Sequence, residues 1–177
     1  KVLGEQAIGT LADGSFPAHQ FLVANLYGQH TVGDRTVSKD VVIDFFVERA
    51  LAGEPLTVYE PGTQARNFVH VKDVANAFCL SAEHLLDVHA RGETGSTAFE
   101  LATDEAPSVM EMAELVAEVA REERGLDPTV ELVANPRAAE TLVDEFTVDT
   151  TAVRETLGWE PHHTVEATIR ERLREEN

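Results

Sequence analysis

Two arginines in this sequence stand at positions where they could bind phosphate. Arg66 precedes the short apolar run FVHV (68–71), and Arg137 follows Pro136 in a loop after a second apolar run. Planar guanidinium groups bind phosphate oxygens in bidentate fashion, so two arginines at strand ends could hold a diphosphate. However, acidic residues outnumber basic ones by 32 to 14. Spacing alone therefore favours the pairing of these arginines with carboxylates.

Other residue types that often do chemistry are better explained by structure. His70 lies in the middle of a predicted strand, where we expect a hydrogen-bonded core histidine rather than a general base. His162 and His163 lack partners at metal-ligand spacing, which predicts a loop or surface role and no metal site. Ser108 and Glu111 form a capping-box pattern, which favours a helix start over a nucleophile. No glycine-rich phosphate loop of either common spacing occurs.

The composition bounds the class of protein. A chain of 177 residues with 43% hydrophobic content can bury a core, and its length alone predicts a single domain. Its net charge of -18 argues against nucleic acid or an anionic membrane as a partner. An excess of carboxylates is also typical of proteins adapted to high salt, which we take as a hypothesis.

The single cysteine, Cys79, sits among apolar residues of a predicted helix. We expect an inert buried thiol there, and a chain with one cysteine favours a cytoplasmic location. No apolar run approaches the roughly 20 residues that cross a bilayer, and the start does not resemble a secretory leader. The sequence therefore predicts a soluble protein.

Strands and helices alternate along the sequence, which predicts an α/β fold. Residues 1–12 have helical spacing without a start signal, so they are interpreted as the later part of a helix. The apolar run FLVAN (21–25) is typical of a strand buried on both faces in a parallel sheet, and residues 28–38 are interpreted as a polar loop. Further strands are expected at residues 56–59, 68–71, 99–102 and 129–133. Further helices are expected at residues 39–52, after a cap at Asp73, and from Ser108 to Gly125. Two more are expected near the end of the chain, one from a cap at Asp149 to Leu157 and one along Val165, Ile169 and Leu173.

Four segments in the same order resemble the C-terminal half of the extended short-chain dehydrogenase/reductases, the NAD-dependent nucleotide-sugar epimerases and dehydratases. They are ANLYGQH (24–30), AGEPLTVYEPGTQARNFVHVKDVANAF (52–78), ELATDEAPSVMEMAELV (100–116) and VDTTAVRETLGWEP (148–161). The second is similar to the family's G-x-P stretch that runs into R-D-F-(I/V)-H-V-x-D. The resemblance covers nearly the whole chain.

This resemblance implies roles for five residues. Lys1 would be the active-site lysine, which holds the nicotinamide ribose of NAD and lowers the pKa of a catalytic tyrosine outside this sequence. Asn25 would hydrogen-bond the nucleotide sugar, Arg66 and Arg137 would bind its diphosphate, and Glu140 would meet the ribose hydroxyls of the nucleotide. With the resemblance, diphosphate binding becomes the favoured interpretation of the two arginines.

The sequence also departs from the family pattern. Gln29 stands where a proline is usual, Leu22 where an arginine is usual, and Asn67 where an aspartate is usual. Residues 137–140 are RAAE rather than R-P-G-D. These departures leave the reaction open among epimerases, 4,6-dehydratases, decarboxylases and reductases.

The implied fold is the tail of a Rossmann-type, doubly wound parallel sheet with a smaller α/β substrate lobe. Residues 1–30 and 68–105 would complete the NAD-binding domain, residues 31–67 and 106–177 would form the lobe, and the N-terminal nucleotide-binding half would be absent. NAD would be bound mainly by that half. We expect the substrate-binding part of a UDP-sugar 4-epimerase-like enzyme, inactive alone and a homodimer when full length. A 4,6-dehydratase or decarboxylase and a non-catalytic sugar-nucleotide binding or interaction module are the alternatives.

Overall fold

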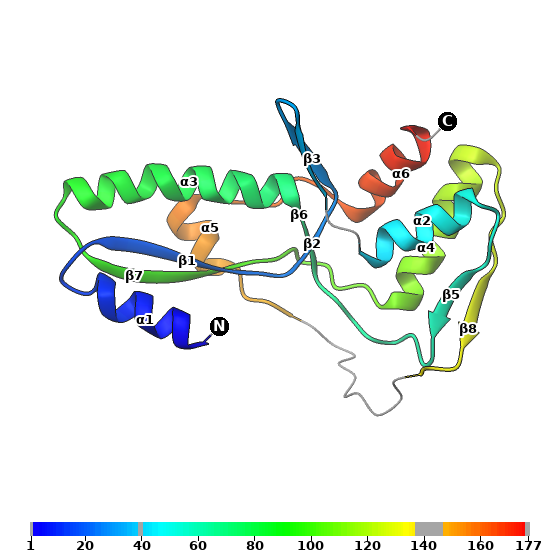
Figure 1. Ribbon diagram of the computed structural model, residues 1–177, viewed down its shortest axis with the longest axis horizontal. Coiled ribbons are helices and arrows are strands. Elements are labelled where there is room, and N and C mark those ends of the chain that lie inside the picture. Colours follow the sequence, from blue (N-terminus) through cyan, green and yellow to red (C-terminus); the bar gives the residue numbers. More distant parts are fainter. Residues whose placement is uncertain (1, 39–40, 137–146, 176–177) are drawn as a thin grey trace.

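The computed structural model describes residues 2–38, 41–136 and 147–175 (Figure 1). The helices are α1 (Val2–Ala12), α2 (Val42–Leu51), α3 (Val71–Ala90), α4 (Val109–Arg124), α5 (Thr151–Leu157) and α6 (Val165–Glu175). The strands are β1 (Pro17–Val23), β2 (Asn25–Tyr27), β3 (Gln29–Val32), β4 (Arg35–Ser38), β5 (Leu56–Tyr59), β6 (Phe68–His70), β7 (Gly95–Leu101) and β8 (Val130–Val133). The fold is α/β as predicted, but the alternation of strands and helices is incomplete, because β1 to β4 follow one another without a helix between them.

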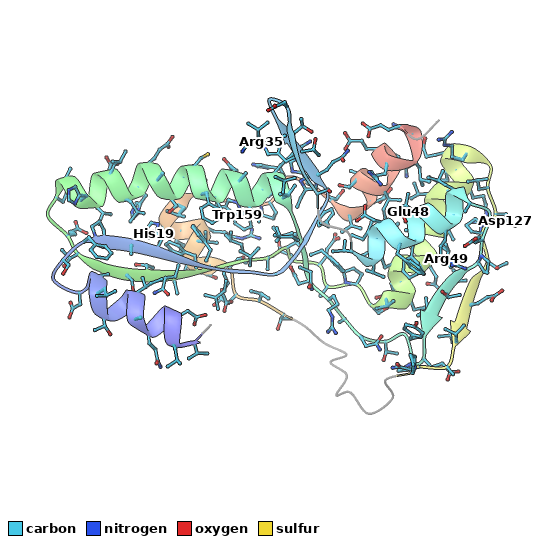
Figure 2. The ribbon with its side chains drawn as sticks, viewed as in Figure 1. His19, Arg35, Glu48, Arg49, Asp127 and Trp159 are labelled. Carbon is cyan, nitrogen blue, oxygen red and sulfur yellow. The ribbon has the colours of Figure 1, made fainter. Side chains whose placement is uncertain are left out.

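The first of two hydrophobic cores is built on the parallel pair β1 and β7. In Figure 1 helix α1 lies below this pair and α3 lies above it, with α5 close to both α3 and β7. Trp159, fully buried and labelled in Figure 2, packs in this core. Although α5 lies within the range predicted for the substrate lobe, its Val153 and Leu157 also pack here. The two-lobe division as a whole stays a prediction.

The prediction that FLVAN is buried on both faces is wrong. Leu22 is 42% exposed and Val23 is 37% exposed. Among the described residues, β1 pairs only with β7, so its other edge has no neighbouring strand. Because consecutive side chains of a strand point to opposite faces, the exposure of Leu22 and Val23 shows that neither face of the run is fully covered.

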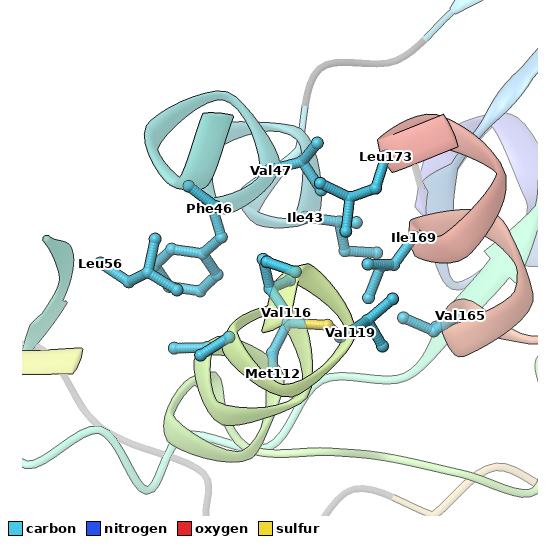
Figure 3. Packing of buried hydrophobic residues seen from close by; sticks show 14 of the residues in the cluster. Ile43, Phe46, Val47, Leu56, Met112, Val116, Val119, Val165, Ile169 and Leu173 are labelled. Carbon is cyan, nitrogen blue, oxygen red and sulfur yellow. The ribbon is translucent and has the colours of Figure 1, made fainter. Parts of the chain in front are cut away.

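The second core lies between α2, α4, α6 and β5 (Figure 3). Helical spacing of apolar residues explains it, because side chains three or four positions apart share one face. In α2 these are Ile43, Phe46 and Val47, and in α6 the predicted stripe is buried as expected. The stripe of α6 consists of Val165, Ile169 and Leu173.

The two cores meet at the parallel pair β2 and β6. Successive side chains of a strand point to opposite faces. In β6, accordingly, Phe68 packs in the second core and Val69 packs in the first. Tyr27 of β2, which lies opposite His70 in the ladder, also belongs to the second core.

Residues 28–38 are not a loop, contrary to the prediction. β3 and β4 form an antiparallel hairpin that projects from the body of the molecule (Figure 1). Val32 lies opposite Arg35, so Gly33 and Asp34 make a two-residue turn in which Gly33 has φ of 62°. Glycine at the first turn position with positive φ is a hairpin signal that the polar composition obscured.

Two expectations for α3 are also wrong. The helix is capped by His70, whose Nδ1 accepts a hydrogen bond from the Lys72 backbone N–H at 3.1 Å, and not by Asp73. Cys79 is exposed rather than buried. Val74, Ala77 and Ser81 form the buried stripe, and position 79 falls on the opposite side of a helix with about 3.6 residues per turn.

None of the helices that the structure describes is long and apolar enough to span a bilayer. Within the same residues, no group of three or more His, Cys, Asp or Glu side chains is arranged to hold a metal ion.

Candidate functional site

Arg66 lines a cavity of about 540 Å³ beside α2, β5 and the start of α4. The walls include Val42 and Phe45 from α2 and Tyr59 from β5, so they are largely apolar and aromatic. Of the described residues that line the cavity, Arg66 is the one charged side chain. Such a site offers an apolar wall and a single localised positive charge to a ligand.

The backbone of Arg66 is held by the segment that leads into α4. Its N–H donates to the Pro107 carbonyl at 3.1 Å, and Val109 N–H donates to the Gln64 carbonyl at 3.2 Å. Ala65 and Ser108 form an isolated antiparallel bridge between these hydrogen bonds. The arginine therefore extends from a fixed backbone rather than from a free loop.

The start of α4 that supports this backbone is itself capped. Ser108 Oγ accepts from Glu111 N–H at 3.1 Å, and the Glu111 carboxylate accepts from Ser108 N–H at 2.7 Å. The capping box predicted from the sequence is confirmed. These reciprocal bonds satisfy amides that the first helical turn would otherwise leave without partners.

Within the described part of the chain, Arg66 forms no ion pair with a carboxylate. Its Nη1 donates to the Ala65 carbonyl at 3.3 Å. Other arginines do pair with carboxylates, as Arg49 does with Glu54 at 3.1 Å and Arg154 with Asp104 at 3.0 Å. The carboxylate pairing that spacing favoured for Arg66 is therefore not seen among these residues.

Asn25 lies close to Arg66 because both adjoin Asn67. The backbone carbonyl of Asn67 accepts two hydrogen bonds from Asn25, one from the backbone N–H at 3.1 Å and one from Nδ2 at 3.0 Å. Asn25 is exposed, so its side chain is accessible. The structure thus brings together two of the five predicted site residues.

The other three predicted site residues, Lys1, Arg137 and Glu140, lie outside the described residues. Pro136 directly precedes Arg137 and lines the same cavity as Arg66.

Sequence reasoning missed a buried polar cluster around Asp73. Its Oδ1 lies 2.8 Å from His163 Nδ1, and its Oδ2 accepts from His163 N–H at 3.0 Å. Its backbone carbonyl accepts from Trp159 Nε1 at 2.8 Å. His163 therefore binds a buried carboxylate and is more than the surface or loop histidine expected from sequence. The family-like segments 52–78 and 148–161 contain Asp73 and Trp159, but they do not show which partners these residues bind.

The rings of the same cluster are closely packed. The His70 ring stacks on that of His163 with 4.3 Å between centroids, and Tyr27 Oη donates to the His163 carbonyl at 3.0 Å. Burial, together with the neighbouring His163, lowers the pKa of His70 to about 4, and burial raises the pKa of Tyr27. His70 is 3% exposed and neutral at physiological pH, which confirms the predicted hydrogen-bonded core histidine.

A second cavity, of about 480 Å³, lies beside Gly28 and His70. Charges of both signs line it, including Lys72 and Arg172 as well as Asp44. Mixed charge does not select a ligand of one sign, and Arg66 does not line this cavity. Asn25 is not among the described residues that line either cavity. The cavity at Arg66 is therefore the better candidate for binding an anion.

Comparisons with known proteins give three kinds of match. A family model described as "NAD dependent epimerase/dehydratase family" matches residues 1–93. UDP-glucuronic acid decarboxylase 5 of Arabidopsis thaliana is 29% identical over 136 residues, which cover 75% of this chain and 34% of that protein. UDP-glucose 4-epimerase of Lactobacillus helveticus is 25% identical over 150 residues, which cover 81% of this chain and 42% of that protein.

Among solved structures, UDP-glucose-4-epimerase from Stenotrophomonas maltophila with bound NAD and formylated UDP-arabinopyranose superposes with a TM-score of 0.70 at 21% sequence identity. The match covers 98% of this chain and 52% of that one, and it concerns the fold. The chain thus spans about half of this structure and less than half of the two curated relatives.

Proposed function

Because the chain belongs to the NAD dependent epimerase/dehydratase family, we propose that it is the C-terminal, substrate-binding part of an NAD-dependent nucleotide-sugar epimerase, similar to the UDP-sugar 4-epimerases. The observation that carries the proposal is the cavity at Arg66. Its described walls combine apolar and aromatic side chains with one guanidinium group. A nucleoside diphosphate has the matching chemistry, with a flat base at one end and an anionic diphosphate group at the other.

Each side chain would bind a different part of that ligand. The Arg66 guanidinium would donate two parallel hydrogen bonds to diphosphate oxygens. The rings of Phe45 and Tyr59 would pack against the base, because both line the same cavity. Asn25, held beside Asn67, would donate a hydrogen bond to the nucleotide sugar. Arg137 would add a second guanidinium next to Pro136, and Glu140 would accept hydrogen bonds from the ribose hydroxyls.

The described residues do not fit NAD by themselves. A dinucleotide pyrophosphate needs a glycine-rich turn between a strand and a helix N-terminus. Here β6 ends at His70 and α3 begins at Val71, which leaves no room for such a turn, and residues 102–108, which connect β7 to α4, contain no glycine. NAD would therefore be bound mainly by a preceding half, with Lys1 reaching the nicotinamide ribose. We expect the chain alone to bind the nucleotide sugar without turnover.

A UDP-sugar decarboxylase is the second candidate. It is favoured by one observation, the 29% identity to a UDP-glucuronic acid decarboxylase of Arabidopsis thaliana. Both reactions would use the same diphosphate-binding arginines. We infer that the difference between them depends on residues beside the catalytic tyrosine, which this sequence does not contain.

Calorimetric titration of the 177-residue chain with UDP-glucose and with uridine tests the binding proposal. We expect UDP-glucose to bind more tightly, and Arg66→Ala to weaken it by about tenfold or more, the effect of losing a charged hydrogen-bond donor. Arg121→Ala is the matched control, because Arg121 pairs with the exposed Asp127 and does not line the cavity. Equal affinity in the Arg66 and Arg121 variants would overturn the proposal.

The reaction is tested with the product of the complete gene. It is incubated with NAD and, separately, with UDP-glucose and UDP-glucuronic acid, and the nucleotide sugars formed are identified by mass spectrometry and NMR. An epimerase converts UDP-glucose to its C4 epimer without change of mass. A decarboxylase instead releases CO₂ from UDP-glucuronic acid and leaves a UDP-pentose, which would replace the epimerase proposal.

A further inference from the structure

Asn67 is a buried polar residue at the point where Asn25, Arg66 and the segment after β7 meet. The residue is 1% exposed. Its Nδ2 donates to the carbonyls of Thr103 at 2.6 Å and Glu105 at 3.0 Å, and its Oδ1 accepts from Thr103 N–H at 3.0 Å. The side-chain amide therefore holds residues 103–105 by three hydrogen bonds.

The hydrogen-bond partners of residue 67 favour a side-chain amide over a carboxylate at this position. Two of the three partners are carbonyl oxygens, which accept and cannot donate. A carboxylate of the same shape would place negative oxygen against both carbonyls in a buried site. The asparagine that departs from the family's usual aspartate is thus matched by its acceptors in this chain.

The bonds of Asn67 reach the candidate binding residues in two ways. Residues 103–105 lead to Pro107, whose carbonyl accepts from the backbone N–H of Arg66. The backbone carbonyl of Asn67, which the anchored side chain holds in place, accepts from Asn25 N–H and from Asn25 Nδ2. We propose that Asn67 is a positioning residue that fixes Arg66 and Asn25 for a nucleoside diphosphate, an inference that rests on the proposed function.

The test compares UDP with uridine as probes of the 177-residue chain. Uridine lacks the diphosphate, so the ratio of the two dissociation constants reports the diphosphate interaction alone. We expect Asn67→Asp to weaken UDP by about tenfold, as loss of a charged hydrogen bond would, and to change uridine affinity by less than about twofold. Asn67→Ser removes the side-chain amide without adding a charge. If this variant also weakens UDP binding, electrostatic repulsion between a new carboxylate and the diphosphate cannot be the cause. The Ser variant also replaces the Asp variant if the Asp variant fails to fold.

Trp159→Phe is the matched control for lost stability. It also removes a buried hydrogen bond, from Nε1 to the Asp73 carbonyl, but in the first core. We expect this variant to unfold at lower temperature and to keep the wild-type ratio of UDP to uridine affinity. If the ratio of UDP to uridine affinity falls equally in the Asn67 and Trp159 variants, Asn67 has only a structural role and the inference is overturned.

Amide hydrogen exchange measured by NMR separates this inference from the proposed function. In the Asn67 variants, the Arg66 and Asn25 amides should exchange at least about tenfold faster than in the wild type, because opening these hydrogen bonds then requires less free energy. Unchanged exchange would overturn the positioning role even if UDP binds. If the wild type shows no preference for UDP, the proposed function fails, while the exchange rates still decide whether Asn67 holds the two residues.

Discussion

The carboxylate of Asp73 in the first turn of α3 binds both the ring and the backbone N–H of His163, which follows 90 residues later in the chain. The segment between α5 and α6 is thereby tied to the helix that follows β6. Trp159 in the same segment donates to the Asp73 carbonyl. One acidic side chain and its own backbone thus anchor a connection that has no regular secondary structure.

Removing the Asp73 carboxylate should destabilise the fold strongly. Asp73→Ala leaves two donors of His163 without their acceptors, and we expect a loss of about 3 kcal/mol in the free energy of unfolding, measured in urea. Asp73→Asn keeps one acceptor and should lose less. Glu83→Ala, at an exposed position of the same helix, should change it by no more than about 0.5 kcal/mol. Similar losses at positions 73 and 83 would contradict this role.

His70 should make the fold sensitive to acid. Its pKa is about 4 in the folded chain against 6.5 for an unperturbed histidine, because burial and the adjacent His163 disfavour the charged ring. Between these pH values the unfolded chain binds a proton that the folded chain does not, so stability falls as pH falls, by about 3 kcal/mol in total. Lys72 and His30 add to the effect, and Asp73 opposes it.

The measurement compares the free energy of unfolding at neutral pH and near pH 4.5 for the wild type and His70→Asn. Asparagine can still cap α3 but does not titrate. The acid-induced loss should be about 2–3 kcal/mol smaller in this variant. His89→Gln, exposed near the other end of α3, should behave as the wild type. An equal loss in wild type and His70→Asn would rule out His70 as the titrating group.

Gly28 should tolerate no side chain. A Cβ there would lie 2.1 Å from His70 Nε2, and the backbone φ of 76° already disfavours other residues. Gly53 has a similar φ of 68° but open space around the same position. Gly53→Ala should therefore reduce the free energy of unfolding by about 1 kcal/mol, and Gly28→Ala by about 3 kcal/mol, since the buried ring cannot move aside without strain. Thermal or urea unfolding that gives equal losses would refute the contact.

Salt should stabilise the protein. With a net charge of -18, like-charge repulsion should outweigh attractive pairs such as Glu123 with Arg170, and added KCl screens both. We expect the unfolding midpoint to rise by roughly 2–4 °C between about 0.1 M and 2 M KCl, the shift that about 1 kcal/mol gives in a chain of this length. Glu114→Gln with Glu118→Gln, which neutralises two exposed acids one turn apart on α4, should reduce the rise. Full stability in dilute buffer would oppose the high-salt hypothesis.

Local patterns predicted the helices well and the partners of individual side chains poorly. The apolar stripe of α6 and the capping box at Ser108 depend on residues within a few positions of each other, so the sequence contains all the information. Asp73 looked like a cap because the nearest polar residue usually is one. Its actual partner, His163, is brought near by the fold. The two residues are 90 positions apart in the sequence, and local spacing patterns do not relate residues at that separation.

The candidate site was predicted in the same uneven way. The position of Arg66 indicates a possible phosphate ligand, the family resemblance favours that role and adds Asn25, and the structure places both residues beside Asn67. From the sequence, Asn67 is a departure from the family pattern, and no role follows from that. Its function in holding residues 103–105 depends on carbonyl groups contributed by a distant strand end, which a linear sequence does not display.

The alternation of Phe68 and Val69 between the two cores has a consequence for how the chain can evolve. A one-residue slip of β6 against β2 would turn each side chain toward the wrong core at once. Insertions and deletions between Arg66 and His70 should therefore be absent from functional homologues, whereas the tip of the β3–β4 hairpin should vary in length. The two cores are expected to unfold in one cooperative transition, because neither keeps its shared wall when the other is lost.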